Sequence, residues 1–504
     1  MPSSRVPSPL TPGATLPAVE VQPAAPEAAD YLVVGVTGSP EAPVLMGVPA
    51  NVDKLAPGSL QELAVDLGAK PDAGAVAVLP RCGAQLLAVG VGTGELTPEQ
   101  VRRSTGAALR EAVGRAGERE LHVAISLNTA EAELVRAAIE GALLGGYEFV
   151  KVGSGPRQKL ARITVVSSLS GAPAKQMVAE AQAVAQAVLV ARDWINTPAN
   201  LLYPESFAAD VRELVKGSKL EVEVLDEKQL AKEGFGGILA VGGGSQRPPR
   251  LVRLEHKPRG AKSHLVLVGK GVTFDTGGLN LKTADGMYTM KCDMSGAAAV
   301  LAATRAIAEL GLGVWVTCYA SLAENMPSGA AYRPSDVITM YGGTTVENAN
   351  SDAEGRLVMA DALARTQADK PDLVVDVATL TGACMVALGN RIAGLMTSDD
   401  ATADLVLDAA ETAGEEFWQL PIPEHLRKGL ESKVADVKSS GGRLGGALTA
   451  AAFLQHFVGQ DTAWAHLDIA GPAFNDDNAY DYVPVGGTGH AVRTLVELAR
   501  GLQS

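Results

Sequence analysis

The chain has 504 residues, more than a single hydrophobic core usually serves, so at least two domains are expected. Hydrophobic residues make up 47% of the chain and charged residues 20%, the balance of an ordinary globular protein rather than a disordered or fibrous one. The net charge of −14 argues against nucleic acid as a main partner, because phosphate backbones are negative too.

Residues 1–29 are rich in proline and small residues and contain no apolar stretch behind a basic start. This composition predicts a disordered tail rather than a signal peptide. No apolar run in the chain reaches the roughly 18 residues that span a bilayer. The four cysteines are scattered and form no CxxC pair, which fits reduced thiols. We therefore expect a cytoplasmic protein that does not enter a membrane.

Short β-branched runs alternate with helical stretches through residues 30–173, which predicts an N-terminal α/β domain. The runs predicted as strands are Tyr31–Val36, Ala75–Leu79, Leu86–Gly92 and Leu121–Leu127, and the predicted helices are Pro98–Arg115 and Ala130–Leu144. Residues 174–193 are alanine-rich with apolar residues at helical spacing, so they predict a linking helix. Residues 194–504 then form a larger C-terminal domain.

The C-terminal domain contains three nearly continuous apolar runs, at His264–Gly271, Gly313–Ser321 and Asp372–Leu380. Strands that are buried on both faces have this pattern. Helices are predicted between them at Ser295–Leu310 and Ala353–Ala368. The expected fold class is α/β with two domains, the larger one built on a mostly parallel central sheet wrapped by helices. Such sheets place their sites in the loops beyond the carboxyl ends of the strands.

Four carboxylates lie at these predicted junctions between strands and helices: Asp275, Asp293, Asp352 and Glu354. Like charges in one cleft raise one another's pKa values unless cations neutralise them. Oxygen ligands without His or Cys exclude a structural zinc knot and suit Zn, Mn or Mg in a two-metal site. Lys270 could add an amine ligand if it lost its proton. The pattern therefore predicts a two-metal centre.

Each of these residues also has a structural interpretation. An aspartate beside glycines, such as Asp275, is typical of a turn, and Asp352 could simply cap a helix. We prefer a joint site because the carboxylates occur together at strand ends of one predicted sheet. His466 is interpreted as a core histidine, or one behind the site, rather than as a ligand.

Six segments of the second half together resemble the leucyl aminopeptidases, also called cytosol aminopeptidases or peptidase family M17. The resemblance is dense from Arg192 to Leu498 and covers the first domain by layout only. It implies a homohexamer. The segments are GKGVTFDTGGLNLK (Gly269–Lys282), MKCDMSGAAA (Met290–Ala299), NSDAEGRL (Asn350–Leu357), DVATLTGA (Asp376–Ala383), AHLDIAGPA (Ala465–Ala473) and GGTGHAVRTLVELA (Gly486–Ala499).

Carried over position by position, the resemblance implies a complete set of metal ligands. Asp275 and Glu354 would bridge two divalent ions. Lys270 and Asp293 would complete one ion and Asp352 the other. The identity of the metals is left open between Zn, Mn and Mg.

The resemblance also implies the residues that serve the reaction. Lys282 would polarise the scissile carbonyl, and Arg356 would hold a bicarbonate ion as general base. The expected activity is the removal of N-terminal residues, preferably apolar ones such as Leu, from peptides by attack of a hydroxide that bridges the metals. The residues implied in substrate binding are Met290, Asn350, Thr379, Gly382, Ala470 and Ala473.

Two other functions are weighed against this one. Some members of the family also bind DNA, so a DNA-binding regulatory protein on the aminopeptidase fold is the alternative, although the negative charge argues against it. The second of these functions is an inactive scaffold that binds metal. The implied metal ligands, Lys282 and Arg356 are all present in the sequence, which argues against an inactive protein.

Overall fold

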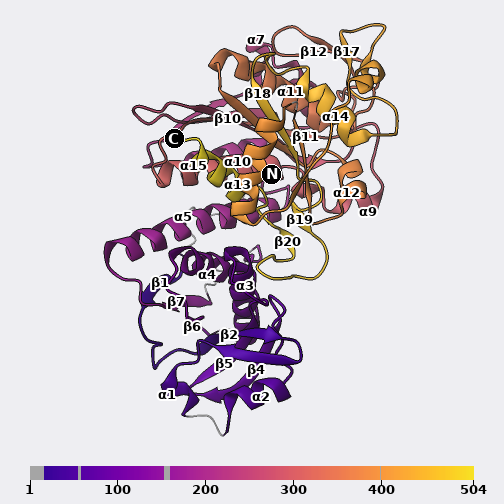
Figure 1. Ribbon diagram of the computed structural model, residues 1–504. Coiled ribbons are helices and arrows are strands. Elements are labelled where there is room, and N and C mark those ends of the chain that lie inside the picture. The colour runs from indigo at the N-terminus through magenta and orange to yellow at the C-terminus, as the bar shows by residue number, and fades with distance from the viewer. Residues whose placement is uncertain (1–15, 55–57, 118, 153–158, 398, 504) are drawn as a thin grey trace, which may run out of the picture. The chain divides into compact units, whose positions relative to one another are not determined.

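The structure is a computed structural model that describes residues 16–54, 58–117, 119–152, 159–397 and 399–503. The described chain divides into two compact units. One comprises residues 16–189 together with Asn475–Val485, and the other comprises Val190–Phe474 together with residues 486–503. The predicted α/β fold class with two domains is confirmed, and each unit is built on a sheet of its own (Figure 1).

The first unit contains a seven-stranded sheet in the order β1-β7-β6-β2-β5-β4, with β3 paired to β2. Its central pairings are parallel, whereas β3 and β4 pair antiparallel to their neighbours. Strands occur at all four of the predicted runs. The strands are β1 (Ala18–Gln22), β2 (Tyr31–Ser39), β3 (Ala42–Met46), β4 (Val76–Cys82), β5 (Ala84–Gly90), β6 (Leu121–Ser126) and β7 (Leu160–Val166).

Two long helices of the first unit, α3 (Pro98–Arg115) and α4 (Ala132–Gly145), pack against each other and on this sheet (Figure 1). Helix α3 begins where the sequence predicts, because the Thr97 side chain accepts a hydrogen bond from the Gln100 backbone and Pro98 favours the first turn. The shorter helices are α1 (Ala50–Asp53) and α2 (Leu60–Asp66).

The structure differs in detail from the expected division of the chain at three places. Ala18–Gln22 form strand β1 and pair in parallel with β7, so the predicted disordered tail is wrong for these five residues, while residues 1–15 lie outside the described residues. The linking helix is longer than expected, α5 (Gly171–Asn196), and the division of the chain into two units falls within it, between residues 189 and 190. Asn475–Val485 groups with the first unit, where Asp481 forms an ion pair with Arg103 at 2.8 Å.

The second unit is built on an eight-stranded sheet in the order β16-β15-β18-β14-β10-β11-β9-β8. Its four central strands are parallel, and both sides of the sheet are extended by antiparallel pairings. The three predicted apolar runs are β10 (His264–Asp275), β11 (Trp315–Asn325) and β14 (Leu373–Ala378). The others are β8 (Glu221–Leu225), β9 (Arg250–His256), β15 (Ala393–Thr397), β16 (Phe417–Gln419) and β18 (Ala463–Asp468).

Helices cover both faces of this sheet. Adjacent residues of a strand point to opposite faces. A side chain at Gly269 would meet Ala297 of α10 (Ser295–Glu309), whereas Lys270 lies against Gly355 of α11 (Glu354–Thr366). Helix α15 packs against both α10 and α13, and α14 packs against α11 (Figure 1). Helices α10 and α11 bring their first turns to the carboxyl end of β10.

The remaining elements of the second unit complete the layers and the surface loops. Among the described residues, no helix combines the length and the apolar character that are needed to cross a bilayer. The remaining elements are α6 (Pro204–Leu214), α7 (Glu227–Glu233), α8 (Gly236–Gly242), α9 (Ala284–Tyr288), η1 (Met290–Cys292), β12 (Val337–Thr339), β13 (Thr345–Glu347), η2 (Gln367–Asp369), α12 (Gly382–Leu388), α13 (Asp400–Ala413), η3 (Glu424–Leu430), β17 (Val437–Lys438), α14 (Gly446–Gln455), β19 (Phe474–Asn475), β20 (Gly486–Gly487) and α15 (Val492–Gly501).

Candidate metal centre

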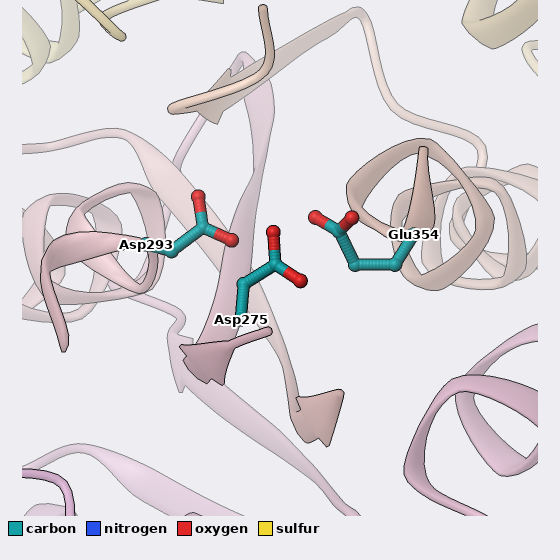
Figure 2. A group of neighbouring side chains, drawn as sticks. All are labelled: Asp275, Asp293 and Glu354. Atoms are coloured by element: carbon teal, nitrogen blue, oxygen red, sulfur yellow. The ribbon is translucent and has the colours of Figure 1, made fainter. Parts of the chain in front are cut away.

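Three carboxylates from distant parts of the sequence meet at the carboxyl end of the central sheet. Asp275 is the last residue of β10, Asp293 follows η1 just before α10, and Glu354 is the first residue of α11. One oxygen from each lies within 4.8 Å of the others, and all three side chains are buried. Figure 2 shows the three carboxylates directed toward one another. Burial of so many acids in one place requires compensating cations.

Lys270 supplies one positive charge to this cluster. Its Nζ lies 2.7 Å from Asp293 Oδ1 and 2.8 Å from Glu354 Oε1, and it also donates to the Thr379 carbonyl at 3.0 Å. Burial alone would lower the pKa of Lys270, but the surrounding carboxylates outweigh it and raise that pKa. A Cβ on Gly355 would lie only 2.4 Å from Lys270 Cε, so glycine at 355 makes room for the lysine.

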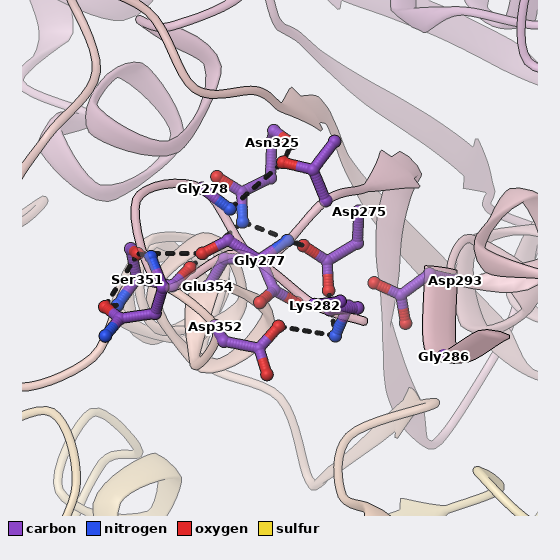
Figure 3. A network of polar contacts seen from close by, with 12 residues as sticks. Asp275, Gly277, Gly278, Lys282, Gly286, Asp293, Asn325, Ser351, Asp352 and Glu354 are labelled. Carbon is purple, nitrogen blue, oxygen red and sulfur yellow. Dashed lines mark hydrogen bonds and ion pairs between the residues drawn. The ribbon is translucent and has the colours of Figure 1, made fainter. Parts of the chain in front are cut away.

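Lys282 connects Asp352 to the cluster. Its Nζ lies 2.8 Å from Asp275 Oδ2 and 2.5 Å from Asp352 Oδ1 (Figure 3). Asp352 is more exposed than the other acids, with 34% of its side chain accessible, and it is not part of the group of three. The structure therefore brings the predicted ligands together in two linked sets, one around each lysine.

The acids of the cluster differ in their electrostatics. Burial, reinforced by Glu354, raises the pKa of Asp275 to about 6. Burial likewise holds the pKa of Asp293 well above its ordinary value. Burial opposes ionisation of Glu354 too, but Lys270 and Lys282 outweigh it and lower the pKa of Glu354 to about 2. One fully ionised acid thus lies beside acids whose charge is costly, and a divalent cation would relieve that cost.

Two buried carboxylate oxygens lack hydrogen-bond partners within the described chain, Asp293 Oδ2 and Glu354 Oε2. A buried oxygen without a partner costs free energy, and such atoms often mark the position of an ion. The donor set consists of carboxylates and one amine, which suits hard or borderline divalent metals. The residues present therefore fit a metal centre.

Arg356 lies on α11, two residues after Glu354. Its side chain is buried and donates one hydrogen bond, from Nη1 to the Ser439 carbonyl at 3.0 Å. Its Nε has no partner among the described residues. Burial lowers the pKa of Arg356 to about 10, against the opposing effect of Glu354 and Asp468. A buried guanidinium with a free donor is suited to an anion.

Comparison with known proteins assigns the chain to a family. Residues 189–496 match the model of the catalytic domain of the cytosol aminopeptidase family, and residues 33–156 match the model of its N-terminal domain. The chain belongs to the cytosol aminopeptidase family. The resemblance drawn from the sequence motifs is thereby confirmed, including for the first domain, and this aminopeptidase is a hydrolase of the peptidase class.

Curated relatives of this aminopeptidase are similar over nearly their whole length. A probable cytosol aminopeptidase of Cutibacterium acnes is 54% identical over 477 residues, covering 94% of this chain and 94% of the relative. A probable cytosol aminopeptidase of Streptomyces avermitilis is 49% identical over 495 residues, covering 94% of this chain and 95% of the relative. Their descriptions name aminopeptidases and give the DNA-binding alternative no support.

Solved structures agree with this assignment. The bottromycin maturation enzyme BotP in complex with Mn is 41% identical, has a TM-score of 0.83, and covers 95% of this chain and 100% of its own. A mutant of tomato leucine aminopeptidase is 31% identical with a TM-score of 0.85, covering 97% of each chain. The family is metal-dependent, and the carboxylate cluster of this aminopeptidase is consistent with that.

The residues expected to bind substrate lie in loops and at the first residues of two short helices, η1 and α12. Thr379 follows β14 and donates from Oγ1 to Asp293 Oδ1 at 2.8 Å. Asn350 accepts from the Asp352 backbone at 2.9 Å. Gly382 is exposed, and Ala473 is buried with 1% of its surface accessible. Met290 precedes Asp293 by one helical turn, and Ala470 follows β18; both are partly exposed.

His466 lies in the core beside this edge, as the sequence indicated. It is fully buried in β18, and its Nδ1 lies 2.5 Å from Asp376 Oδ1 on the neighbouring strand β14. Trp464 donates to the other oxygen of Asp376 at 2.7 Å. His466 does not belong to the carboxylate group of three.

Sequence reasoning missed the polar residues that support the acids. Asn325 contacts Asp275, and Asp468 accepts from the Leu380 and Thr381 backbones at 3.1 and 3.4 Å, which holds the loop of Thr379. Asn325 and Asp468 are the final residues of β11 and β18. Their position at strand ends of the central sheet was a signal that could have identified them.

Proposed function

We propose that this protein is a two-metal aminopeptidase that removes N-terminal residues from peptides, preferably apolar ones such as Leu. The observation that carries this proposal is the buried cluster of Asp275, Asp293 and Glu354, with its two unpartnered oxygens. A cluster with unpaired buried anions costs stability unless it performs a task that needs a cation. Peptide hydrolysis is such a task.

Five residues would hold the two ions, and their contacts divide them into two groups. Lys270 links Asp293 and Glu354, whereas Lys282 links Asp275 and Asp352. Zn, Mn or Mg would suit these donors, and manganese is the ion named for the similar BotP structure. When bound, the ions supply Lewis-acid polarisation of the peptide carbonyl and activation of water. The proposed ligands are Lys270, Asp275, Asp293, Asp352 and Glu354.

Lys282 and Arg356 would serve the reaction itself. Lys282 keeps 19% of its side chain accessible, so its ammonium group can reach a substrate carbonyl and stabilise the oxyanion that forms there. Arg356 has a buried Nε donor without a partner in the described chain, and it would hold a bicarbonate ion that accepts the proton of the attacking water. We also propose that Met290, Asn350, Thr379, Gly382, Ala470 and Ala473 contact the substrate.

The first test compares substrates with and without a free amine. Leucine amide should be hydrolysed by protein reconstituted with Mn²⁺, because a free α-amine can anchor on a cation at Lys270 and Asp293. N-acetyl-leucine amide should be cleaved at least about 100-fold more slowly, since it lacks that anchor. Removal of metal by a chelator should abolish the activity and Mn²⁺ should restore it. Equal turnover of the two amides, or full activity after chelation, would contradict the proposal.

Metal binding should also depend on pH in a defined direction. The carboxylates keep Lys270 protonated, and the pKa of Asp275 is raised to about 6. Lys270 must lose a proton to bind metal throughout the range from pH 8 to 5, and Asp275 must do so as the pH falls through about 6, so protons should be released on binding and Mn²⁺ affinity should fall as the pH drops. Calorimetry in buffers of different ionisation enthalpy measures both effects. An affinity that is constant over this range would exclude these two residues as ligands.

Family resemblance supports the proposed assembly, and the composition of the chain supports the proposed location. We propose a homohexamer in the cytoplasm that acts on peptides. A stable monomer in sedimentation would contradict the assembly, and recovery of the activity outside the cytoplasmic fraction would contradict the location.

A further inference from the structure

Asn325 is a fully buried residue at the junction of three site loops. It ends β11 directly opposite Asp275 in the parallel register with β10. Its backbone carbonyl accepts hydrogen bonds from Thr276 N at 3.1 Å and Thr276 Oγ1 at 2.8 Å. The ends of the two strands are therefore fixed to each other just where Asp275 leaves the sheet.

The side-chain amide of Asn325 joins two of the proposed metal-binding segments. Nδ2 donates to Asp275 Oδ1 at 2.8 Å and to the Ser351 carbonyl at 3.0 Å. Asp275 Oδ1 accepts a second hydrogen bond, from Gly277 N, also at 2.8 Å. Two donors thus occupy Oδ1, which leaves Oδ2 as the oxygen that faces a cation, at present the ammonium of Lys282.

Ser351 makes the second connection between the same loops. Its Oγ donates to the Gly277 carbonyl at 2.7 Å and accepts from Asn280 N at 2.8 Å, while its backbone N–H donates to Asn280 Oδ1 at 2.9 Å. Figure 3 shows this network between the loop after Asp275 and the segment that leads into Glu354. Ser351 immediately precedes Asp352, so its position sets where that carboxylate lies.

The side chains that make these links, the amide of Asn325 and the hydroxyl of Ser351, carry no charge, and this affects metal binding. A lysine or arginine in place of Asn325 would add a positive charge that competes with a metal for Asp275. An amide and a hydroxyl orient the carboxylates without changing the charge of the site. Groups that hold metal ligands in this way commonly change metal affinity by 10- to 100-fold when they are removed.

We propose that Asn325 and Ser351 are positioning residues that fix Asp275 relative to Asp352 and so set the affinity of the metal centre. This inference rests on the proposed function, since it assumes that both aspartates bind metal. Neither residue needs to touch the substrate. Their effect would reach the reaction only through occupancy and geometry of the ions.

The test uses Asn325→Ser and Ser351→Ala in the full chain, stripped of metal with a chelator. Calorimetry should show Mn²⁺ binding weakened by about 10- to 100-fold in each variant. The rise in melting temperature on adding Mn²⁺ should be smaller than in the wild type, and excess Mn²⁺ should restore much of kcat. The matched control is Asn475→Ser, because Asn475 Nδ2 also donates to two carbonyls, those of Asn478 and Pro484, away from the carboxylates.

Each outcome separates the two proposals. Unchanged Mn²⁺ affinity in both folded variants, when the wild type binds Mn²⁺, overturns the positioning role and leaves the proposed function intact. The same loss of affinity in Asn475→Ser would show a general effect of destabilisation and also overturn it. A wild type that binds no Mn²⁺ overturns both proposals. If Asn325→Ser fails to fold, the milder Ser351→Ala decides the question.

Discussion

Replacement of Glu354 by glutamine is expected to remove most of the bound metal and to lower kcat/KM for leucine amide by about 1,000-fold or more. Metal ions contribute several kcal/mol of transition-state stabilisation, and about 1.4 kcal/mol corresponds to each factor of ten. Glutamine keeps the size of the side chain but loses its negative charge. Glu354 is the acid with the lowered pKa, about 2, so it is ionised at every pH where the enzyme would work.

The contacts of Glu354 explain why no other residue should compensate. Oε1 pairs with Lys270 at 2.8 Å, and Oε2 is buried without a partner among the described residues. The matched control is Glu347→Gln, a glutamate of the same unit whose Oε2 accepts from Ser432 Oγ at 2.6 Å. Metal content by plasma emission spectroscopy and leucine amide turnover provide the readouts. Normal metal content and turnover in Glu354→Gln would remove Glu354 from the proposed site.

The local sequence patterns predicted the elements that surround the site. The apolar run of β10 is a pattern of neighbouring residues, so the hydrophobic pattern alone locates this strand. The sequence did not predict strand β1, because its five residues are partly exposed and lie in a proline-rich segment that resembles a tail. The strand is defined by its hydrogen bonds to β7, which is distant in the sequence. The contacts of Asn475–Val485 with α3 could not be predicted for a related reason, since they join residues 378 and 383 positions apart.

The features of the candidate site also fall into those that the sequence could predict and those that depend on contacts in the folded chain. The acids could be predicted from charge and placement at strand ends, because like charges at one sheet edge imply a cation. The pairing of Lys270 with Glu354, or of Lys282 with Asp352, is a property of the folded chain that no local pattern contains. Asn325 carries no charge and makes its contacts over 50 and 26 positions, so the sequence offers only its place at the end of a strand.

Replacement of Lys282 by methionine is expected to lower kcat by about 100- to 1,000-fold while the metal content stays close to that of the wild type. Removal of one donor that stabilises a developing oxyanion commonly has an effect of this size. Methionine retains the apolar length of the side chain and lacks the ammonium group. KM should change much less than kcat, because the interaction strengthens in the transition state.

Retention of metal is the decisive part of this result. Lys282 bridges Asp275 and Asp352, so loss of its charge leaves two acids that repel each other more strongly and therefore favour a divalent ion. Lys159→Met is the matched control, because Lys159 has 20% of its side chain accessible and forms one ion pair, with Glu148 at 2.8 Å. A Lys282→Met protein that loses its metal, or one that keeps full kcat, would contradict a role in polarising the carbonyl. Metal retained with slow turnover would separate the two lysines, one as a ligand and the other as a group that acts on the substrate.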